Sequence, residues 1–459
     1  MRRLMILGAL AALVVLLGAA LVALRDVPAA PPALPQQQEA YRMLYTRPRQ
    51  DFKQLTVTLA SGESYTVLSD MGFDAQGNLL GVYNGLGQPV VVQGQEGFAL
   101  DANSYQMMLL AAMNLPVTAS YPGLDLEACG LATPSGRLEI HYHTGEKIVL
   151  NIGNTTASGQ SCYVQLAGDD NVHLVPVDFR QVLTRPLTAH HRLPGPLNKA
   201  ASTAVQIAIV RPDGETFMAS NYGTSGRILP WQVDKPYVHA GSTERITAFV
   251  EAVAAIRAEG YVATLSSAAD MAHYGLDNPT RLLVAYSDGT IRDIHLGSDA
   301  GDGTVYARLD ATADVYRVSA AQLPQTSDAV VDALLDRFVA LVSSNDVASV
   351  AIRAGEEAWL LAISPEGYAI NGHAADADVF SNAYRAVVGM QFDKTTKDAP
   401  AVEEICEVRF LHGDGTITQV VYHDFDHHYV QAETSGGGGF LLRRERLEDM
   451  LTTLKEAAQ

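Results

Sequence analysis

Alternating apolar and polar residues recur in three parts of the chain, each time on both sides of a turn that contains glycine. These parts are residues 55–68, 205–220 and 347–363. Alternation places every second side chain on the same face of a strand, and a turn between two such runs joins them as an antiparallel pair. We therefore predict three β-hairpins, each with one buried face.

Apolar residues at helical spacing follow each predicted hairpin. Residues 103–115 form a short apolar run that ends at Pro116, and two later runs follow Ser242 and Asp376, whose side chains commonly cap helices. The later runs are Ile246, Phe249, Val250, Val253 and Ile256, and then Val379, Phe380, Ala383 and Val387. Three helices are predicted here, and residues 327–342 are predicted to form a fourth.

A longer pattern recurs after the predicted helices. Residues 130–183 and 275–323 both open with Gly-Leu-x-x-Pro and continue as strand, glycine turn, strand, tyrosine-containing strand and strand. Residues 407–451 keep the strands, an Asp-Gly turn and a closing helix but lack the opening motif. Recurrence of the motif favours a structural role over ligand binding, although Asp277 within it has no counterpart in the other copies.

Together these elements predict an α+β fold of three repeated units, each an antiparallel β-hairpin and meander with a helix, after one N-terminal transmembrane helix. The predicted units span residues 45–195, 200–337 and 343–457, and the third is degenerate. The transmembrane helix is assigned to residues 4–24 and a Pro/Ala/Gln tether to residues 26–44.

The N-terminal segment supports a membrane location. Residues 4–24 carry no charge, and as a helix they would reach about 31 Å, the thickness of a bilayer core. Arg2 and Arg3 precede this run, which predicts a cytoplasmic N-terminus and an extracytoplasmic body in the cell membrane. A cleaved signal peptide is the alternative, because small residues lie near the end of the run. The prolines of the tether predict a semi-rigid spacer.

The net negative charge of the chain argues against nucleic acid as a binding partner. The 459 residues carry a formal net charge of −19 at pH 7, and 47% of them are hydrophobic. A strongly acidic chain does not release counterions from phosphates, so nucleic acid is not expected as a partner. The hydrophobic fraction is typical of a folded, globular protein.

The sequence contains no motif that identifies a catalytic centre. It lacks a phosphate-binding Walker loop, a dinucleotide-binding glycine fingerprint, a zincin pair and a nucleophile elbow. His141 and His143 would share one strand face, and residues 423–428 contain three histidines and two aspartates. Zinc could use such ligands, but the turn-aligned positions in the second copy are Ala285 and Ser287, which favours a hairpin surface. We assign no catalytic, cofactor-binding or metal-binding residue.

Two other features leave alternatives open. Cys129 and Cys162 are compatible with one disulfide or with buried free thiols, and Cys406 is the third cysteine. The glycine-rich residues 435–439 are predicted to form a flexible hairpin loop rather than a phosphate cradle, because no helix start or lysine follows.

The second unit resembles a known family. "YGLDNP" at residues 274–279, the following strand pair with its Asp-Gly turn, and "IHLGSDAGDGTVYARLDATADVYRVS" at residues 294–319 are similar to the domain-of-unknown-function family 4340. Trp231 also fits its pattern. The resemblance covers residues 205–330 best and is weak beyond residue 343. It implies one N-terminal membrane helix and an association with ABC-transporter components of the gliding-motility type.

Three functions follow as expectations. The first is a non-enzymatic, membrane-anchored extracytoplasmic binding or scaffold protein, an accessory subunit of an ABC-transporter-like cell-envelope complex with protein partners. The second is a protein that binds a soluble ligand or a cell-wall polymer in clefts between units; aromatic residues lining such a cleft would favour it. The third is a metal-dependent hydrolase that uses the histidines.

Overall fold

A computed structural model describes most of the chain after the tether. The described residues are 42–69, 72–73, 79–80, 91–95, 97–225, 228–310, 312–327, 332–400 and 403–459. They form two compact units: the first ends at Pro186, and the second contains residues 99–101 together with everything from Leu187 onward.

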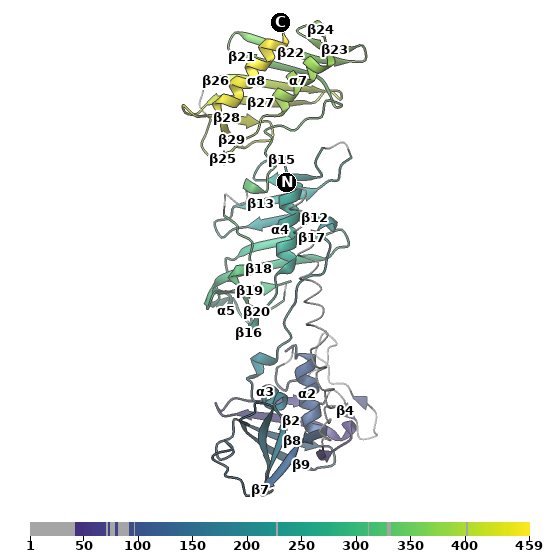
Figure 1. Ribbon diagram of the computed structural model, residues 1–459, viewed down its shortest axis with the longest axis vertical. Coiled ribbons are helices and arrows are strands. Elements are labelled where there is room, and N and C mark those ends of the chain that lie inside the picture. Colours follow the sequence, from purple (N-terminus) through teal and green to yellow (C-terminus); the bar gives the residue numbers. More distant parts are fainter. Residues whose placement is uncertain are drawn as a thin grey trace, which may run out of the picture. The chain divides into compact units, whose positions relative to one another are not determined.

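A seven-stranded antiparallel sheet forms the body of the first unit (Figure 1). Its spatial order is β3 (Ser64–Leu68), β2 (Phe52–Leu59), β8 (Gly136–Tyr142), β9 (Lys147–Thr155), β10 (Ser161–Leu166), β11 (Asn171–Pro176) and β7 (Ala119–Pro122). Two strand pairs accompany it, β1 (Arg42–Thr46) with β6 (Asn114–Val117) and β4 (Gly72–Phe73) with β5 (Leu79–Leu80). The helical elements are η1 (Arg49–Asp51), α2 (Ala102–Met113) and α3 (Val177–Leu183).

The second unit contains two nine-stranded antiparallel sheets. The first of them, here the middle sheet, has the order β15 (His239–Ala240), β14 (Trp231–Lys235), β13 (Thr216–Asn221), β12 (Ala204–Val210), β17 (Thr280–Tyr286), β18 (Ile291–Gly301), β19 (Thr304–Leu309), β20 (Asp314–Ser319) and β16 (Gly260–Thr264). Its helical elements are η2 (Leu187–His190), η3 (Ala201–Thr203), α4 (Thr243–Ala255), α5 (Ala268–His273) and η4 (Ala320–Gln322).

The other sheet, here the C-terminal sheet, is connected in a similar way. Its order is β24 (His373–Ala375), β23 (Gly367–Ile370), β22 (Glu357–Ser364), β21 (Val347–Ala354), β26 (Glu404–His412), β27 (Ile417–Asp424), β28 (Tyr429–Thr434), β29 (Gly439–Arg443) and β25 (Lys394–Thr396). Helices α7 (Ala377–Val388) and α8 (Arg444–Ala457) lie side by side across one face of the sheet (Figure 1).

The first strands of the three predicted hairpins, β2, β12 and β21, bury their apolar side chains mainly on one face, as the alternation predicted. In β12 the buried positions are Ala204, Ile207 and Ile209, and α4 contributes Phe249 and Val253 to the same core. The predicted cap at Ser242 is confirmed, because its side chain accepts the Arg245 amide at the start of α4. Asp376 similarly accepts the Asp378 amide at the start of α7. One continuous set of buried apolar residues runs through both nine-stranded sheets.

The predicted fold class is wrong. The described chain is mostly β-sheet, and it is not an α+β arrangement of three hairpin-plus-helix units. The hairpins form where predicted, but the first strand of each pairs with a distant strand, as Ile207 of β12 does with Val284 of β17. Hairpin and meander are therefore parts of one sheet. Long-range pairing of this kind leaves no local signal, because alternation reveals a strand but not its neighbour.

Part of one predicted helix is not helical, and another predicted helix lies outside the described residues. Residues 334–342 are not helical, although a helix was predicted over residues 327–342; their apolar side chains Leu334, Leu335 and Val339 are buried in the shared core. Within the part of the chain that the structure describes, no helix is long and apolar enough to cross a membrane. The predicted transmembrane helix, residues 4–24, lies outside the described residues, as do residues 26–41 of the tether.

The Gly-Leu-x-x-Pro motif is a turn packed against a strand. Gly275 has φ +67°, a left-handed conformation that glycine adopts without strain, and the Ser298 amide donates to the Tyr274 carbonyl at 2.9 Å. The Tyr274 carbonyl also lies against Gly297, where an added Cβ would sit 2.2 Å from its oxygen. The first unit reproduces this contact with Gly153 against the Cys129 carbonyl. Asp277 is exposed. These contacts support a structural role for the motif.

We predict that Gly297→Ala lowers the free energy of unfolding by about 1–3 kcal/mol, because the new methyl group overpacks the Tyr274 carbonyl. Gly195→Ala is the matched control, since an added Cβ there meets nothing within 4 Å. Denaturant unfolding followed by circular dichroism measures both. Equal stability of the two variants would contradict the close-approach interpretation.

Candidate functional site

An extended segment joins the two nine-stranded sheets. In this junction segment, residues 334–342, the Asp336 amide donates to the Ala240 carbonyl at 2.9 Å, while the Leu334 carbonyl accepts the Ser242 amide at 2.8 Å. On the other side, the Val339 amide donates to the Met390 carbonyl at 2.9 Å, and the Arg337 carbonyl accepts the Phe392 amide at 3.0 Å. The segment therefore bonds through its main chain to structure on both sides.

A second contact joins the same two sheets. The amide of Val238 donates to the Gly436 carbonyl at 2.9 Å, and a Cβ added to Gly436 would lie 2.2 Å from the Val238 carbonyl oxygen. A Cβ on Gly438 would lie 3.0 Å from the Tyr237 ring. Residues 435–438 form the turn between β28 and β29, as predicted for this glycine-rich stretch, and Gly439 begins β29. Their lack of side chains allows the loop that carries Tyr237 and Val238 to approach closely.

His239 is buried within this junction. Its Nε2 lies 3.0 Å from the Asp336 carbonyl oxygen, and its ring packs 4.7 Å from that of Phe440 and 5.8 Å from that of Phe392 between centroids. Burial lowers the pKa of His239, and the bond to the Asp336 carbonyl opposes that shift only in part. A neutral imidazole that donates from Nε2 satisfies this geometry.

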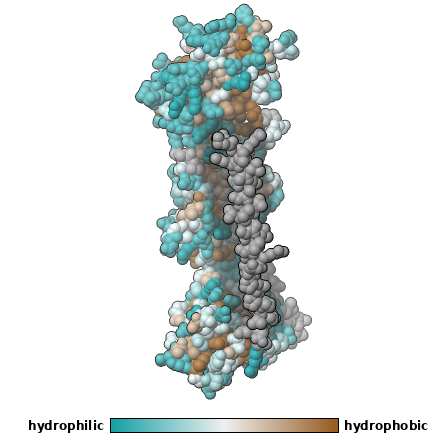
Figure 2. All heavy atoms as spheres, viewed as in Figure 1, coloured by the Kyte–Doolittle hydropathy of each residue, from teal (hydrophilic) through white to brown (hydrophobic). Residues whose placement is uncertain are grey.

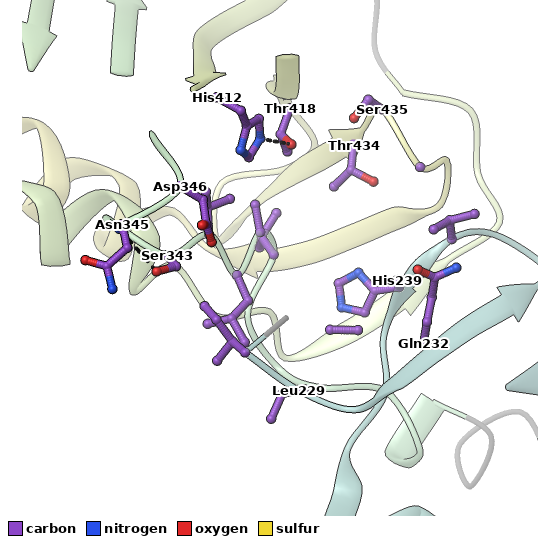
Figure 3. Close-up of a pocket in the computed structure, with 18 of the residues that line it drawn as sticks. Leu229, Gln232, His239, Ser343, Asn345, Asp346, His412, Thr418, Thr434 and Ser435 are labelled. Carbon is purple, nitrogen blue, oxygen red and sulfur yellow. Dashed lines mark hydrogen bonds between the residues drawn. The ribbon is translucent and has the colours of Figure 1, made fainter. Parts of the chain in front are cut away.

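The two contacts border a cavity of about 870 Å³, here the Trp231 cavity (Figure 3). Apolar side chains of Leu229, Trp231 and Val238 line it from the middle sheet, and Val339 and Leu341 of the junction segment continue this wall. Its volume lies within the range of small-molecule sites, about 300–1,000 Å³.

The opposite wall of the Trp231 cavity is polar. His412, Thr418 and Thr434 lie together on that side, facing His239 across the cavity (Figure 3). The His412 Nε2 and the Thr418 hydroxyl are 2.8 Å apart. Asp414 accepts bonds from the Thr416 amide and hydroxyl, which lower the pKa of its carboxyl group. Hydroxyl, amide and imidazole groups in this arrangement can orient a ligand through hydrogen bonds.

Among the described cavity-lining residues, no serine or cysteine is hydrogen-bonded to a histidine that a carboxylate orients. His412 bonds to a threonine hydroxyl, and His239 bonds to a main-chain carbonyl. Nucleophilic catalysis needs a base beside the nucleophile and a group that orients the base. The described lining residues therefore do not present a nucleophile, base and orienting carboxylate together.

The predicted histidine candidates do not converge. His141 Nε2 lies 2.8 Å from Glu139 on the same strand, whereas His143 is exposed beyond the end of β8. His427 and His428 are exposed, and Asp426 accepts the amides of His428 and Tyr429 in a turn. In the described ranges, no group of three or more His, Cys, Asp or Glu side chains is placed to hold a metal ion.

Two histidines that follow the first unit, His190 and His191, are buried. His191 stacks on Tyr261 with ring centroids 3.9 Å apart, and its Nε2 is 3.6 Å from Asp314. Burial lowers the pKa of His191, although Asp314 favours its charged form. All three cysteines are buried free thiols, which resolves the two alternatives for Cys129 and Cys162.

The sequence pattern did not point to the Trp231 cavity. Trp231 was noted only through the family resemblance, and His239 and His412 lie in short segments without a motif. The available signal was the glycine tract at residues 436–439, because consecutive glycines indicate a close approach of main chains. Figure 2 shows a largely hydrophilic surface with smaller apolar patches, which agrees with the acidic composition.

Comparison with known proteins yields one family. The family model described as "Domain of unknown function (DUF4340)" matches residues 91–279 and, in an overlapping second match, residues 231–405. The two matches together cover more than half of the chain and extend past residue 343, where the resemblance by motif is weak. No curated protein and no solved structure matches.

We predict that the second unit loses stability as the pH falls below about 6.5, the ordinary pKa of histidine. Above that value His239 and His191 are neutral in both folded and unfolded chains. Below it the unfolded chain binds protons that the folded chain excludes, at up to about 1.4 kcal/mol per pH unit for each site.

The replacement His239→Gln keeps a donor for Asp336 and should reduce the loss of unfolding free energy between about pH 7.5 and about pH 5.5. His143→Gln, at an exposed histidine of the first unit, is the control and should leave the loss unchanged. Urea unfolding at the two pH values measures both. An unaltered pH dependence in His239→Gln would show that the junction histidine does not contribute.

Proposed function

The chain belongs to the family described as a domain of unknown function (DUF4340), and from this premise we propose that it is a non-enzymatic binding protein of the cell envelope. Its ligand would occupy the Trp231 cavity. The main support for this proposal is the cavity itself, which has an apolar wall and a hydrogen-bonding wall. Its described lining residues do not include a paired nucleophile and base.

The lining favours a hydroxyl-rich ligand with an apolar face. One wall carries Leu229, Trp231 and Leu341, against which C–H surfaces can pack. The other carries Thr418 and Ser435 hydroxyls and an imidazole, which donate to and accept from hydroxyl groups. Saccharide rings combine these two kinds of surface. We therefore propose a soluble glycan or a cell-wall polymer segment as ligand.

The proposed location rests on the N-terminal sequence. The uncharged residues 4–24, preceded by Arg2 and Arg3, would hold the protein in the cell membrane with its body outside. A tether rich in proline would then keep the body at a distance from the lipid. In that position the Trp231 cavity would be open to envelope polymers.

Binding is tested by calorimetric titration with chitotetraose, a muropeptide disaccharide and maltotetraose. We predict that Ser435→Trp, at an exposed cavity-lining position, abolishes binding of the glycan that titrates, and that His412→Phe weakens it about tenfold by removing hydrogen bonds. Ser61→Trp, at an exposed turn of the first unit, is the control.

Equal affinity of Ser435→Trp and the unmodified protein would show that the ligand lies elsewhere. Failure of all three glycans, with the fold intact by circular dichroism, would overturn the glycan proposal.

A second candidate is an accessory subunit of an ABC-transporter-like membrane complex. The family membership and the predicted membrane helix favour it. We predict that the full-length protein, solubilised in mild detergent, co-purifies with a membrane permease. A variant that starts just before β1, so that this strand is kept, and is exported by a cleavable signal serves as the control. Purification without any membrane protein would count against this candidate.

A further inference from the structure

A second cavity, of about 720 Å³, lies beside the contact between the loop that carries Tyr237 and the glycine-rich residues 436–439. It is here called the Gln431 cavity. Tyr237 and Phe217 line it from the middle sheet, Gln431 and Glu433 of β28 line it from the C-terminal sheet, and Leu335 of the junction segment lies between them. It shares no lining residue with the Trp231 cavity.

Gln431 is a buried amide with an unused acceptor. The residue is 1% exposed, and its Nε2 donates to the Asp398 carbonyl at 3.1 Å. Its Oε1 is also buried but has no hydrogen-bond partner. A buried acceptor without a donor is costly to a folded protein, so a group that supplies the donor would be favoured at this position.

The space beside Gln431 depends on glycine. A Cβ added to Gly439 would lie 2.7 Å from the Gln431 Nε2 and 2.9 Å from the Thr396 carbonyl oxygen. Any larger residue at this position would therefore press on the amide. The neighbouring His423 pairs with Gln431 across the strands, and its Nε2 lies 3.7 Å from the Glu433 carboxylate, beyond hydrogen-bond distance.

The charges around the Gln431 cavity are unequal. Its two cations both bind Glu215: Arg211 Nη1 lies 2.9 Å and Lys397 Nζ 2.5 Å from that carboxylate. Three further carboxylates line the cavity, those of Asp332, Asp398 and Glu433. Asp332 accepts the Thr395 hydroxyl at 2.6 Å, but the described residues provide no cation within ion-pair distance of Asp332 or Asp398. The cavity therefore has hydrogen-bond acceptors and negative charge in excess.

We propose that the Gln431 cavity binds a ligand that carries an ammonium group beside an apolar body. The ammonium would donate to Gln431 Oε1 and to the surrounding carboxylates, since charge-assisted hydrogen bonds are stronger than neutral ones. Phe217, Leu335 and the Tyr237 ring supply the apolar wall. This site goes beyond the proposed glycan site, because it uses a different cavity and a charged ligand.

The test uses phenethylamine and its neutral isostere 2-phenylethanol, titrated calorimetrically into the whole protein at neutral pH. The amine should bind, and the alcohol should bind at least about tenfold more weakly, because it lacks the positive charge. Gln431→Met and Glu433→Gln should each weaken amine binding about tenfold. Gln165→Met is the matched control, because the Gln165 Nε2 donates to the Asp169 carbonyl at 2.9 Å in the first unit, outside the cavity.

Melting temperatures separate a binding role from a structural one. Gln431→Met should change the melting temperature no more than Gln165→Met does, because it removes a hydrogen bond and a buried unsatisfied oxygen together. Equal binding of amine and alcohol, no amine binding, or full amine affinity in Gln431→Met would each overturn this proposal. Saturation with a glycan that binds the Trp231 cavity should leave amine affinity unchanged, so the two proposals can fail independently.

Discussion

Main-chain hydrogen bonds from residues 334–339 link the middle-sheet side of the second unit to its C-terminal side. Buried amides and carbonyls must find partners, and this segment finds them at Ala240 of β15 and at Ser242, which caps α4. On its other side it finds them at Met390 and Phe392, in the connection between α7 and β25. A helix would satisfy its own main chain and could not bond to two sheets at once. The extended junction segment is therefore the element that lets one hydrophobic core run through both sheets. The junction segment lines both cavities: Val339 and Leu341 line the Trp231 cavity, and Leu335 lines the Gln431 cavity.

Glycines set the closest contacts of this protein. At Gly153 and Gly297 a carbonyl oxygen occupies the place where a side chain would begin, and at Gly436 the Val238 carbonyl does the same between the two sheets. The first two contacts lie within single sheets and hold the Gly-Leu-x-x-Pro turns against a strand. The third joins the loop before β15 to the turn before β29, and both of its residues line the Trp231 cavity. The lack of a Cβ atom in glycine therefore allows close main-chain contacts both within a sheet and at the junction beside the candidate sites.

The two cavities differ in what they can recognise. Hydroxyl and imidazole groups dominate the polar wall of the Trp231 cavity, where hydrogen bonds can be given and received in both directions. The Gln431 cavity offers mainly acceptors, and its cations are already bound to Glu215. A neutral, hydroxyl-rich ligand suits the first and a positively charged donor suits the second. The acidic composition of the chain is consistent with an electrostatic preference for cations.

Local features of the sequence determined the hairpins at residues 55–68, 205–220 and 347–363 and the capped starts of α4 and α7, because alternation and capping act within a few residues. The α+β repeat was wrong, and the helix predicted over residues 327–342 was wrong for residues 334–342, since apolar spacing reports burial but not the partner that covers it. The tertiary structure alone decided which strands share a sheet. It also brought Trp231, His239, His412 and Thr434 around one cavity, and Phe217, Asp332 and Gln431 around another. Those residues lie far apart in sequence, and only long-range pairing and the main-chain bonds of the junction segment bring them together.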